Sequence, residues 1–343
     1  MARKVKDFSI KHLAQEAGVS ISTVSRVLNN HPDVSESLRK KVQAIIDKNS
    51  FVPDKVNERP IRINVVIGVG DITDYISSIL TGIEDAANEL NVEVSIQRCT
   101  GRISLLNCCR LWRSDGVIII SGNLLLDQVQ TVADADIPCM LINSHMEYRN
   151  VGCINNEFGF TMQQLLNHLH SFGHRKIAFL CAAPENLYSY RKRVEAYKKF
   201  MVSINEKPNR LLVPAYRVAH IEGIGIDKEA GYQQTLQLLF QHPEVTAIAC
   251  ANDELAMGCY KACFDYGKKI PQDISVVGFD DQSFAKYLTP SLTTVKLHMP
   301  QAGKLAVSSL KDFIKGKINE LPRFNLPTEL ITRNSVTRVV EKK

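Results

Sequence analysis

The feature that most constrains the fold is a regular alternation of short apolar runs and amphipathic segments from Arg62 onward. Seven runs have the length and composition of buried strands: Ile63–Gly68, Val92–Ile96, Gly116–Ser121, Pro138–Asn143, Ile177–Cys181, Thr246–Ala251 and Ile274–Phe279. Six stretches between them have the apolar spacing of helices that bury one face: Ile76–Leu90, Leu124–Ala133, Phe158–Phe172, Tyr190–Val202, Glu229–Phe240 and Glu254–Tyr266. Such alternation is typical of parallel sheets covered by helices on both faces. The roughly 280 residues after Arg62 exceed one small sheet, so we expect two doubly wound lobes.

The first fifty residues predict a separate bundle of three short helices. Ser9 and Ser20 can each cap the amino end of a helix, and Gly18 can end the first one because glycine tolerates a positive φ. Pro32 breaks the second helix, and Ser35 can start a third. Two short helices around a tight turn, closed by a third, are typical of a helix-turn-helix module.

The positive charge of the chain is concentrated in this same segment. The whole sequence carries 42 Lys and Arg against 36 Asp and Glu, which gives a net charge of +6. Residues 1–60 hold eleven basic and seven acidic residues, and therefore +4 of that excess. A charge asymmetry of this kind indicates that the amino-terminal segment binds nucleic acid.

The outward face of the second helix carries short hydrogen-bonding side chains around one arginine: Ser22, Thr23, Ser25, Arg26 and Asn29. In the major groove an arginine can bind guanine through two hydrogen bonds, and hydroxyls can reach phosphates. A structural three-helix bundle with a solvated polar face would have the same composition. Composition alone therefore leaves both interpretations open.

The stretch from Ile10 to Asn29 favours the DNA-binding interpretation. It contains the pattern A-G-V-S-x-x-T-V-S-R-V-L-N, which resembles the headpiece of the LacI–GalR family of bacterial transcriptional regulators. The resemblance implies that three side chains read bases: Ile21, Ser22 and Arg26. It implies that four others contact phosphates: Ser20, Thr23, Ser25 and Asn29. We therefore expect double-stranded operator DNA as a partner.

Motifs in the rest of the chain extend the resemblance over nearly its whole length. They are Gly173–Phe179, Ala251–Gly258, Ile270–Asp281 and Tyr287–Val295. The resemblance implies a small all-α helix-turn-helix headpiece and an α/β core like that of periplasmic sugar-binding proteins. In that core, two doubly wound parallel-sheet lobes enclose a small-molecule effector.

The resemblance also sets the expected domain boundaries. The headpiece takes residues 1–53, a hinge linker takes 54–61, and the effector-binding and dimerisation core takes 62–343. Within the core, the N-lobe takes about 62–155 and 297–323, and the C-lobe takes about 156–296 and 324–343.

Several residues follow predicted strands, where ligands bind in open parallel sheets. Asn252 and Asp280 directly follow two of them, and an amide and a carboxylate can bind ligand hydroxyls. Arg193 supplies a rigid set of donors. The resemblance implies effector contacts at these three positions and at Asp71, Asp74, Tyr75 and Phe158, with Phe158 as a stacking face. An alternative for Asp280 is an N-cap of a helix over Gln282–Lys286, and both roles can hold.

The effector itself is constrained only by the resemblance, which implies a sugar or sugar derivative. Sugar binders often stack an aromatic ring on the sugar. Ile226 or a neighbour stands where the family carries such a ring, and the only tryptophan, Trp112, is expected in the core or in an interface.

Several classes of protein are excluded. No run approaches the roughly 18–20 apolar residues of a membrane helix, so no membrane partner is expected. The first residues lack the apolar centre of a signal peptide, so we expect a cytoplasmic location. The nine cysteines are scattered without a C-x-x-C pair, and we expect small buried side chains, not disulfides.

We expect neither a cofactor nor a metal, and we do not expect an enzyme. Gly68 and Gly70 follow a strand, but Thr73 stands where a dinucleotide fingerprint requires a third glycine. We interpret His168, His170 and His174 as surface and capping residues. A solute-binding protein shares the two-lobed fold, but it would not carry a helix-turn-helix. A repressor is preferred over an activator, although the sign depends on where the operator lies.

The expected assembly is a homodimer on a pseudo-palindromic operator, with one headpiece per half-site. The sequence ends without leucine heptads, which favours a dimer over a tetramer. By the same resemblance, Ile76–Leu90 and Leu105–Trp112 form the dimer interface.

The hinge linker departs from the family pattern. In the family, a leucine from each of two hinge helices enters the minor groove and unstacks a base step, which bends the DNA. Counting from Pro53, the leucine position falls on Pro60, which would end the helix at Arg59. Pro60 or Ile61 can still act as a wedge. We expect Arg59, and also Asn57, to contact DNA.

We predict that this protein bends its operator less than family members that carry the leucine. Besides Pro60, the linker places Asp54 and Glu58 near phosphates, which is unfavourable. The bend angle can be measured from the gel mobility of circularly permuted operator fragments. A bend as large as that of leucine-bearing relatives would contradict this prediction.

Overall fold

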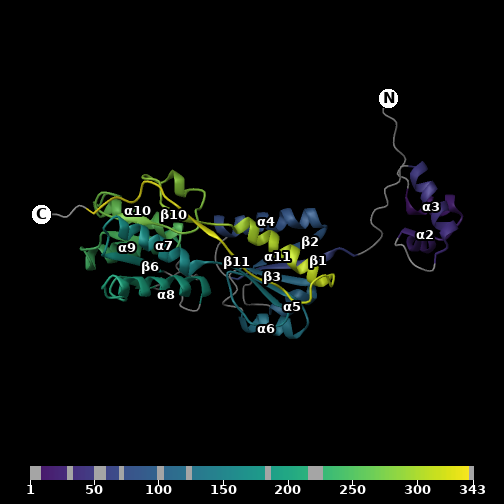
Figure 1. Cartoon of the computed structure of the whole chain (residues 1–343), viewed down its shortest axis with the longest axis horizontal. Coiled ribbons are helices and arrows are strands. Elements are labelled where there is room, and N and C mark those ends of the chain that lie inside the picture. The colour runs from purple at the N-terminus through teal and green to yellow at the C-terminus, as the bar shows by residue number, and fades with distance from the viewer. Residues whose placement is uncertain are drawn as a thin grey trace, which may run out of the picture. The chain divides into compact units, whose positions relative to one another are not determined.

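The computed structural model describes residues 9–28, 34–49, 59–68, 73–98, 104–120, 126–181, 187–214 and 227–339. The chain divides into two compact units, Met1–Pro60 and Ile61–Lys343 (Figure 1). The first is a helical headpiece, and the second is an α/β core.

The headpiece packs three helices around a small apolar core: α1 (Ile10–Ala17), α2 (Ile21–Leu28) and α3 (Glu36–Lys48). Gly18 ends α1 with a φ of 69°, a conformation that glycine adopts without a Cβ clash. Leu13, Val24 and Val42, one from each helix, are fully buried. The predicted helix-turn-helix headpiece is therefore confirmed.

The N-lobe of the core is a six-stranded parallel sheet in the order β11-β5-β4-β3-β1-β2. Its strands are β1 (Ile61–Ile67), β2 (Val92–Arg98), β3 (Gly116–Ile120), β4 (Cys139–Ile142), β5 (Val151–Asn156) and β11 (Arg323–Leu326). Helices α4 (Asp74–Leu90) and α11 (Met299–Ile314) cover one face, and α5 (Leu105–Leu111) and α6 (Leu126–Asp134) cover the other (Figure 1).

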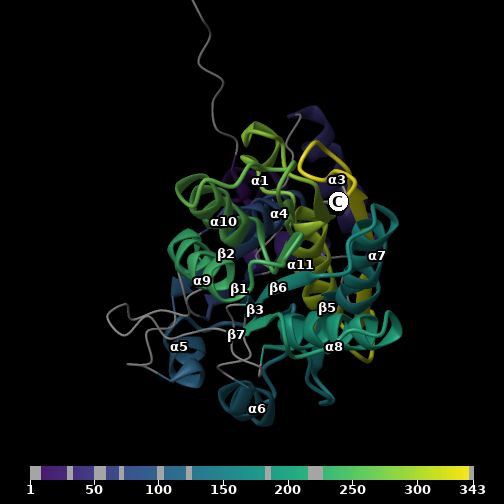
Figure 2. The same cartoon turned by 90° about the vertical axis from the view of Figure 1, so that its left-hand side faces the viewer.

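The C-lobe is a four-stranded parallel sheet in the order β7-β6-β8-β9. Its strands are β6 (Ile177–Cys181), β7 (Leu212–Pro214), β8 (Ala247–Cys250) and β9 (Ser275–Val277). Helices α7 (Phe158–Ser171) and α8 (Tyr188–Ser203) pack together, and α9 (Lys228–Gln241) and α10 (Asp253–Asp265) pack together on the other side of the sheet (Figure 2). The prediction of two doubly wound lobes is confirmed.

Two further strands connect the lobes. β10 (Thr294–Leu297) leads from the C-lobe to α11, and β12 (Thr328–Ile331) leads back from β11, the edge strand of the N-lobe. They pair antiparallel, with Val295 opposite Leu330. Because β11 pairs with β5, the N-lobe sheet continues to Leu326, three residues beyond the boundary at 323 that the sequence suggested.

Several elements were not predicted from the sequence: β5, β7, β10, β11, β12 and α11. β5 illustrates the reason. It ends in two asparagines, Asn155 and Asn156, which are poor strand formers. Its place in the sheet comes from pairing with β4 and β11 on either side, and a single sequence does not reveal that pairing.

The interpretation of His174 as a surface or capping residue was wrong. Its side chain is 2% exposed, and its two ring nitrogens lie 3.0 Å from the Thr246 hydroxyl and 3.0 Å from the Thr337 carbonyl oxygen. Burial lowers the pKa of His174 below its usual value, so the ring is neutral. It ties the carboxyl-terminal segment to the C-lobe sheet. The prediction of buried cysteines without disulfides holds for the described residues: seven of the eight described cysteines are buried, and all eight are free thiols.

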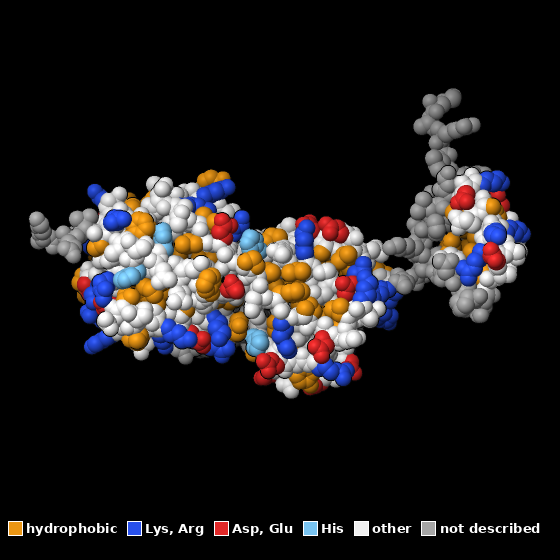
Figure 3. All heavy atoms as spheres, viewed as in Figure 1, with side chains coloured by type: hydrophobic (Ala, Val, Ile, Leu, Met, Phe, Trp, Pro, Cys, Tyr) orange, Lys and Arg blue, Asp and Glu red, His pale blue; other side chains and the backbone are white. Residues whose placement is uncertain are grey.

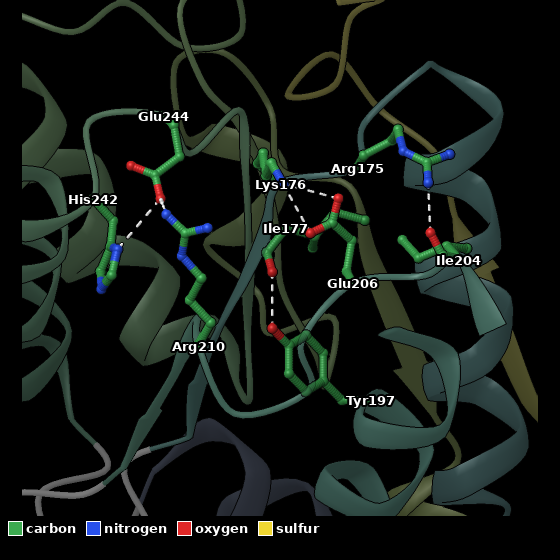
Figure 4. Close-up of polar contacts among 9 residues, drawn as sticks. All are labelled: Arg175, Lys176, Ile177, Tyr197, Ile204, Glu206, Arg210, His242 and Glu244. Carbon is green, nitrogen blue, oxygen red and sulfur yellow. Dashed lines mark hydrogen bonds and ion pairs between the residues drawn. The ribbon is translucent and has the colours of Figure 1, made fainter. Parts of the chain in front are cut away.

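The amino end of the C-lobe sheet is closed by matched charges. Lys176 lies 2.8 Å from Glu206, and Arg210 lies 2.7 Å from Glu244 (Figure 4). The Tyr197 hydroxyl donates to the Ile177 carbonyl oxygen at 2.8 Å and so fixes α8 to β6. Lys176 and Arg210 thus each meet a carboxylate there, and Arg175 donates to the Ile204 carbonyl oxygen.

We predict that Gly82→Ala destabilises the N-lobe because α4 and α11 approach closely there. A Cβ on Gly82 would lie 1.9 Å from the Pro300 carbonyl oxygen, so the helices must separate. The expected loss is about 1–3 kcal/mol in the free energy of unfolding, measured by urea titration. Gly159→Ala in α7 is the matched control, because its nearest neighbour is 3.7 Å away. Equal stability of the Gly82 variant and the parent protein would contradict the close approach.

Candidate DNA-contacting helix and inter-lobe effector site

The exposed face of α2 carries the predicted base and phosphate contacts. The Ser20 hydroxyl accepts a hydrogen bond from the Thr23 amide at 3.1 Å and so caps the helix. It also lies 2.7 Å from the Ser22 hydroxyl and 2.8 Å from that of Thr23. These three hydroxyls therefore form one small cluster at the amino end of the helix.

The other predicted contacts of α2 lie on the same solvent-facing side. Ile21 is 47% exposed, which is unusual for an isoleucine and fits contact with a thymine methyl group. Arg26 is exposed and makes no ion pair within the described part of the headpiece. Ser25 is half-buried beside it. The structure thus brings together the described residues of the predicted DNA contact.

Three of the predicted site residues, Asn29, Asn57 and Asp71, lie outside the described residues. In the linker, the structure describes Arg59 and Pro60. Arg59 is exposed, and both residues directly precede β1.

The carboxyl ends of the strands of the two lobes meet at one place, which we call the inter-lobe site. It is defined by Asp74, Tyr75, Arg193, Asn252 and Asp280. The Ser283 hydroxyl of the C-lobe donates a hydrogen bond to the Asp74 carboxylate at the start of α4. Burial raises the pKa of Tyr75, in the N-lobe, above its usual value, and the charge of the Asp280 carboxylate of the C-lobe raises it further.

Arg193 is buried at the centre of this site and is 4% exposed. Its guanidinium carbon lies 5.2, 4.5 and 4.4 Å from the ring centroids of Phe158, Tyr190 and Phe279. Its Nε donates to the Ser189 carbonyl oxygen at 3.2 Å, and a terminal nitrogen donates to the Ala251 carbonyl oxygen. Aromatic faces therefore stabilise a cation that is largely removed from water.

Phe158 does not offer an open stacking face, contrary to the sequence-based expectation. It is 1% exposed, and its ring packs 6.4 Å from that of Phe279, with Arg193 against it. Because α7 begins at Phe158, this ring points into the C-lobe core. Its place in the structure is to support Arg193.

Asn252 and Asp253 open helix α10 in different ways. The Asn252 side-chain oxygen caps the helix by accepting from the Leu255 amide at 2.8 Å, and its nitrogen donates to the Tyr190 hydroxyl at 3.3 Å. The Asp253 carboxylate is fully buried, and it accepts from the Gln282 amide at 2.8 Å and from the Thr294 hydroxyl at 2.6 Å. Burial raises the pKa of Asp253 well above its usual range.

Asp280 does not cap a helix, so that alternative was wrong. Its φ is 108°, and the next helical turn along the chain is η2 (Ala285–Tyr287), whose N-cap position is Phe284. Its amide donates to the Val295 carbonyl oxygen at 2.8 Å, which fixes it to β10. Burial raises the pKa of the Asp280 carboxyl to about 7, although the Arg193 cation acts in the opposite direction.

Sequence reasoning missed several polar residues at this site. The Asn143 amide donates to the Tyr75 hydroxyl, and the Asn156 amide donates to the Asn143 oxygen at 3.0 Å. Asn143 and Asn156 follow or end β4 and β5, and a polar residue at a strand end was the signal available. Tyr190 and Ser283 carried no such signal, because tertiary packing alone brings them here.

Nothing in the described residues points to a metal centre. No group of three or more His, Cys, Asp or Glu side chains within the described ranges could hold a metal ion. The search of those ranges also found no helix long and apolar enough to cross a membrane.

Two families of known proteins match this chain. The family described as "Bacterial regulatory proteins, lacI family" matches residues 9–54, which include α1, α2 and α3. The family described as "Periplasmic binding protein-like domain" matches residues 166–336.

Individual relatives match over almost the whole chain. The probable HTH-type transcriptional repressor ExuR of Bacillus subtilis is 27% identical over 96% of this chain and 99% of its own length. The lactose operon repressor of Escherichia coli is 28% identical over 96% of this chain and 91% of its own.

Solved structures also match most of this chain. A lac repressor dimer bound to operator and the anti-inducer ONPF has a TM-score of 0.70 at 26% identity, over 96% of this chain and 99% of that one. A LacI family transcriptional regulator from Enterococcus faecium with bound ribose has a TM-score of 0.69 at 25% identity, over 81% of this chain and 100% of that one.

We predict that Asp280→Asn flattens the pH dependence of stability. The pKa is about 7 in the folded protein and near 4 in an unfolded chain, so the folded state holds the proton between these values. The contribution of Asp280 to stability is therefore full below about pH 4 and is lost as the pH rises through about 7. The variant should be more stable than the parent at pH 8 by about 2 kcal/mol, less than the full shift implies because the carboxyl is partly exposed.

Urea unfolding at pH 4.5 and pH 8 measures this difference. Asp127→Asn, which removes an exposed carboxylate from α6, is the matched control and should keep the parent's pH dependence. The same pH dependence in the Asp280 variant and the parent would contradict the raised pKa.

Proposed function

The chain belongs to the LacI family of bacterial regulatory proteins, and we propose that it is a transcriptional repressor that binds a pseudo-palindromic operator as a homodimer. We further propose that a small molecule at the inter-lobe site controls its affinity for the operator. The family's members that match this chain regulate transcription, so the protein is a regulator and not an enzyme. An activator remains the second candidate, because the sign of regulation depends on where the operator lies.

The exposed face of α2 is the observation that carries DNA binding. Three clustered hydroxyls, an exposed isoleucine and an exposed arginine share one face of a helix whose other face is held in a packed core. Arginine binds guanine through two hydrogen bonds, and hydroxyls at a helix amino end suit phosphates. We assign base reading to Ile21, Ser22 and Arg26. We assign phosphate contacts to Ser20, Thr23, Ser25 and Asn29, and further DNA contacts to Asn57 and Arg59. Asn29 and Asn57 lie outside the described residues.

The inter-lobe site supports an effector rich in hydroxyl groups. Asp280 accepts hydrogen bonds, Arg193 donates them and Asn252 can do both. The lac repressor structure that matches this chain is bound to an anti-inducer, and the Enterococcus regulator is bound to ribose. By analogy we propose a sugar or sugar derivative, bound by Arg193, Asn252 and Asp280 with Asp74, Tyr75 and the undescribed Asp71. Phe158 does not contact the effector in this proposal; its buried ring packs against Arg193 and supports it.

The proposed homodimer uses α4 and α5 of the N-lobe. Leu111 and Trp112, at the end of α5, are 72% and 53% exposed. Trp112 is therefore not a core residue, and we propose that it lies in the interface. In the C-lobe, Phe264 and Tyr287 are 78% and 76% exposed. Figure 3 shows apolar side chains scattered over one face of the core. Apolar side chains exposed singly are normal on a protein surface, so the proposal rests on the neighbouring pair Leu111 and Trp112. We place the dimer in the cytoplasm, where its operator lies.

We predict that Arg26→Ala relaxes specificity at one position of each half-site. The operator is obtained by selection from a random pool of double-stranded DNA with the full-length protein, which should enrich a two-fold symmetric sequence. Loss of one bidentate contact should cost about 1–3 kcal/mol on that sequence and less on non-specific DNA.

Lys40→Ala is the matched control, because it removes one exposed cation from α3, outside the proposed groove helix. It should weaken binding to all sequences alike. Fluorescence anisotropy at fixed salt measures both variants. If Arg26→Ala weakened all sequences equally, Arg26 would be a phosphate contact instead.

We predict a dimer of twice 38.4 kDa at micromolar concentration. Sedimentation equilibrium measures the mass directly. Trp112→Asp, which buries a charge if α5 lies in the interface, should shift the population toward the monomer. A parent protein that sediments as a monomer or a tetramer would contradict the proposal.

A further inference from the structure

The inter-lobe site is rich in carboxylates from both lobes. Asp74 stands at the start of α4, Glu254 lies in the first turn of α10, and Asp280 follows β9. Burial raises the pKa of Glu254, and the charges of Asp74 and Asp227 raise it further. These carboxylates are therefore close enough to repel one another.

The cations at the same place are few: Lys228, which is exposed, and Arg193, which is buried. Lys228 opposes the shift at Glu254, and Arg193 opposes the shift at Asp280. The Arg193 guanidinium is enclosed by three aromatic rings and already donates to two main-chain carbonyl oxygens. A site for carboxylate or phosphate normally presents the guanidinium fork openly to the anion. Arg193 can therefore donate hydrogen bonds from the N–H groups that the carbonyl oxygens leave unused, but its guanidinium is not exposed for an anion to pair with.

The two ends of the C-lobe sheet differ in how their charges are compensated. At the amino end, Lys176 and Arg210 pair with Glu206 and Glu244 (Figure 4). At the carboxyl end, the described residues provide no ion pair for Asp74, Glu254 or Asp280, and the one pair close by joins Asp281 to Arg333 at 2.6 Å. Among the described residues at the inter-lobe site, the carboxylates Asp74, Glu254 and Asp280 therefore outnumber the cations Arg193 and Lys228.

Two buried side-chain amide oxygens at this site also lack hydrogen-bond donors. The side-chain oxygens of Asn156 and Gln282 are inaccessible to solvent and have no hydrogen-bond partner among the described residues. The Asn156 side-chain nitrogen donates to the Asn143 side-chain oxygen, and the Gln282 main-chain amide donates to the Asp253 carboxylate. Both residues therefore belong to the surroundings of Tyr75 and Asp280. Buried acceptors without partners favour a ligand that donates hydrogen bonds.

We propose that the inter-lobe site selects an uncharged, hydroxyl-rich effector and discriminates against sugar acids and sugar phosphates. This inference rests on the effector function proposed above. Hydroxyl groups donate to the carboxylates and to the unpartnered amide oxygens, and they accept from Arg193. A carboxylate or phosphate on the ligand would lose its water beside Asp74, Glu254 and Asp280, and the two cations Arg193 and Lys228 do not outnumber these carboxylates.

The test compares ligands that share a skeleton and differ in charge. The full-length protein is heated with glucose, glucuronate or glucose 6-phosphate, with galactose or galacturonate, and with ribose or ribose 5-phosphate. Each ligand is used at the same concentration, because binding raises the melting temperature by an amount that grows with the ratio of ligand concentration to dissociation constant. We expect at least one uncharged sugar to raise it, and each anionic form of that skeleton to raise it less. An anionic form that stabilises more than its parent sugar overturns the proposal, as does a panel in which no uncharged sugar stabilises.

Paired variants test whether the carboxylates cause the discrimination. Asp74→Asn removes one charge at the amino end of α4, and Glu89→Gln removes one exposed charge near its other end. Calorimetric titration gives the ratio of the dissociation constants of the acid and the sugar for each protein. We expect Asp74→Asn to reduce that ratio about fivefold and Glu89→Gln to leave it unchanged, since Coulomb interaction falls with distance. An unchanged ratio in Asp74→Asn overturns the electrostatic origin.

Operator binding separates this proposal from the function on which it rests. Anisotropy with the selected operator is measured without any ligand. A protein that binds its operator but prefers an anionic sugar overturns only the charge selection. A protein that binds no DNA overturns the proposed function, whichever sugars raise its melting temperature.

Discussion

The main-chain hydrogen bonds between the loop that carries Asp280 and strand β10 are the contacts on which the rest of the core depends. The Gly278 amide donates to the Thr293 carbonyl oxygen at 2.9 Å, and the Asp280 amide donates to that of Val295 at 2.8 Å. β10 in turn pairs with β12, and both strands run between the lobes. A ligand that moves this loop therefore moves the connection between the sheets, because packed elements shift as units. The Asp281–Arg333 ion pair adds a second link from the same loop to the chain after β12.

The same loop explains why the site is both polar and largely closed to water. Asp253 lies beneath it and binds the Gln282 amide and the Thr294 hydroxyl. Gly278 is required there, because a Cβ at this position would lie 2.1 Å from an Asp253 carboxylate oxygen. Ser283 reaches from the loop to Asp74 in the other lobe. One short segment thus joins the buried carboxylate, the proposed effector contact and the opposite lobe.

Local patterns in the sequence predicted what depends on neighbours along the chain. The capping serines, Gly18 and the exposed face of α2 follow from a few adjacent residues, and the structure has the predicted headpiece. The alternation of runs predicted both doubly wound lobes, and the rule for strand ends placed Asn252 and Asp280 at the inter-lobe site. What failed depends on contacts between distant segments. Phe158 lies beneath Arg193, and His174 is buried by Thr337, which is 163 residues away.

We propose that ligand binding between the lobes and operator binding by the headpiece are coupled. Coupling is reciprocal, so operator DNA must change the affinity for the ligand by the same factor that the ligand changes affinity for DNA. The most direct measurement is calorimetric titration of an uncharged sugar identified by thermal shift into the full-length protein, alone and saturated with its selected operator. We expect dissociation constants that differ by about fivefold or more. Equal constants, with both ligands shown to bind, would contradict it.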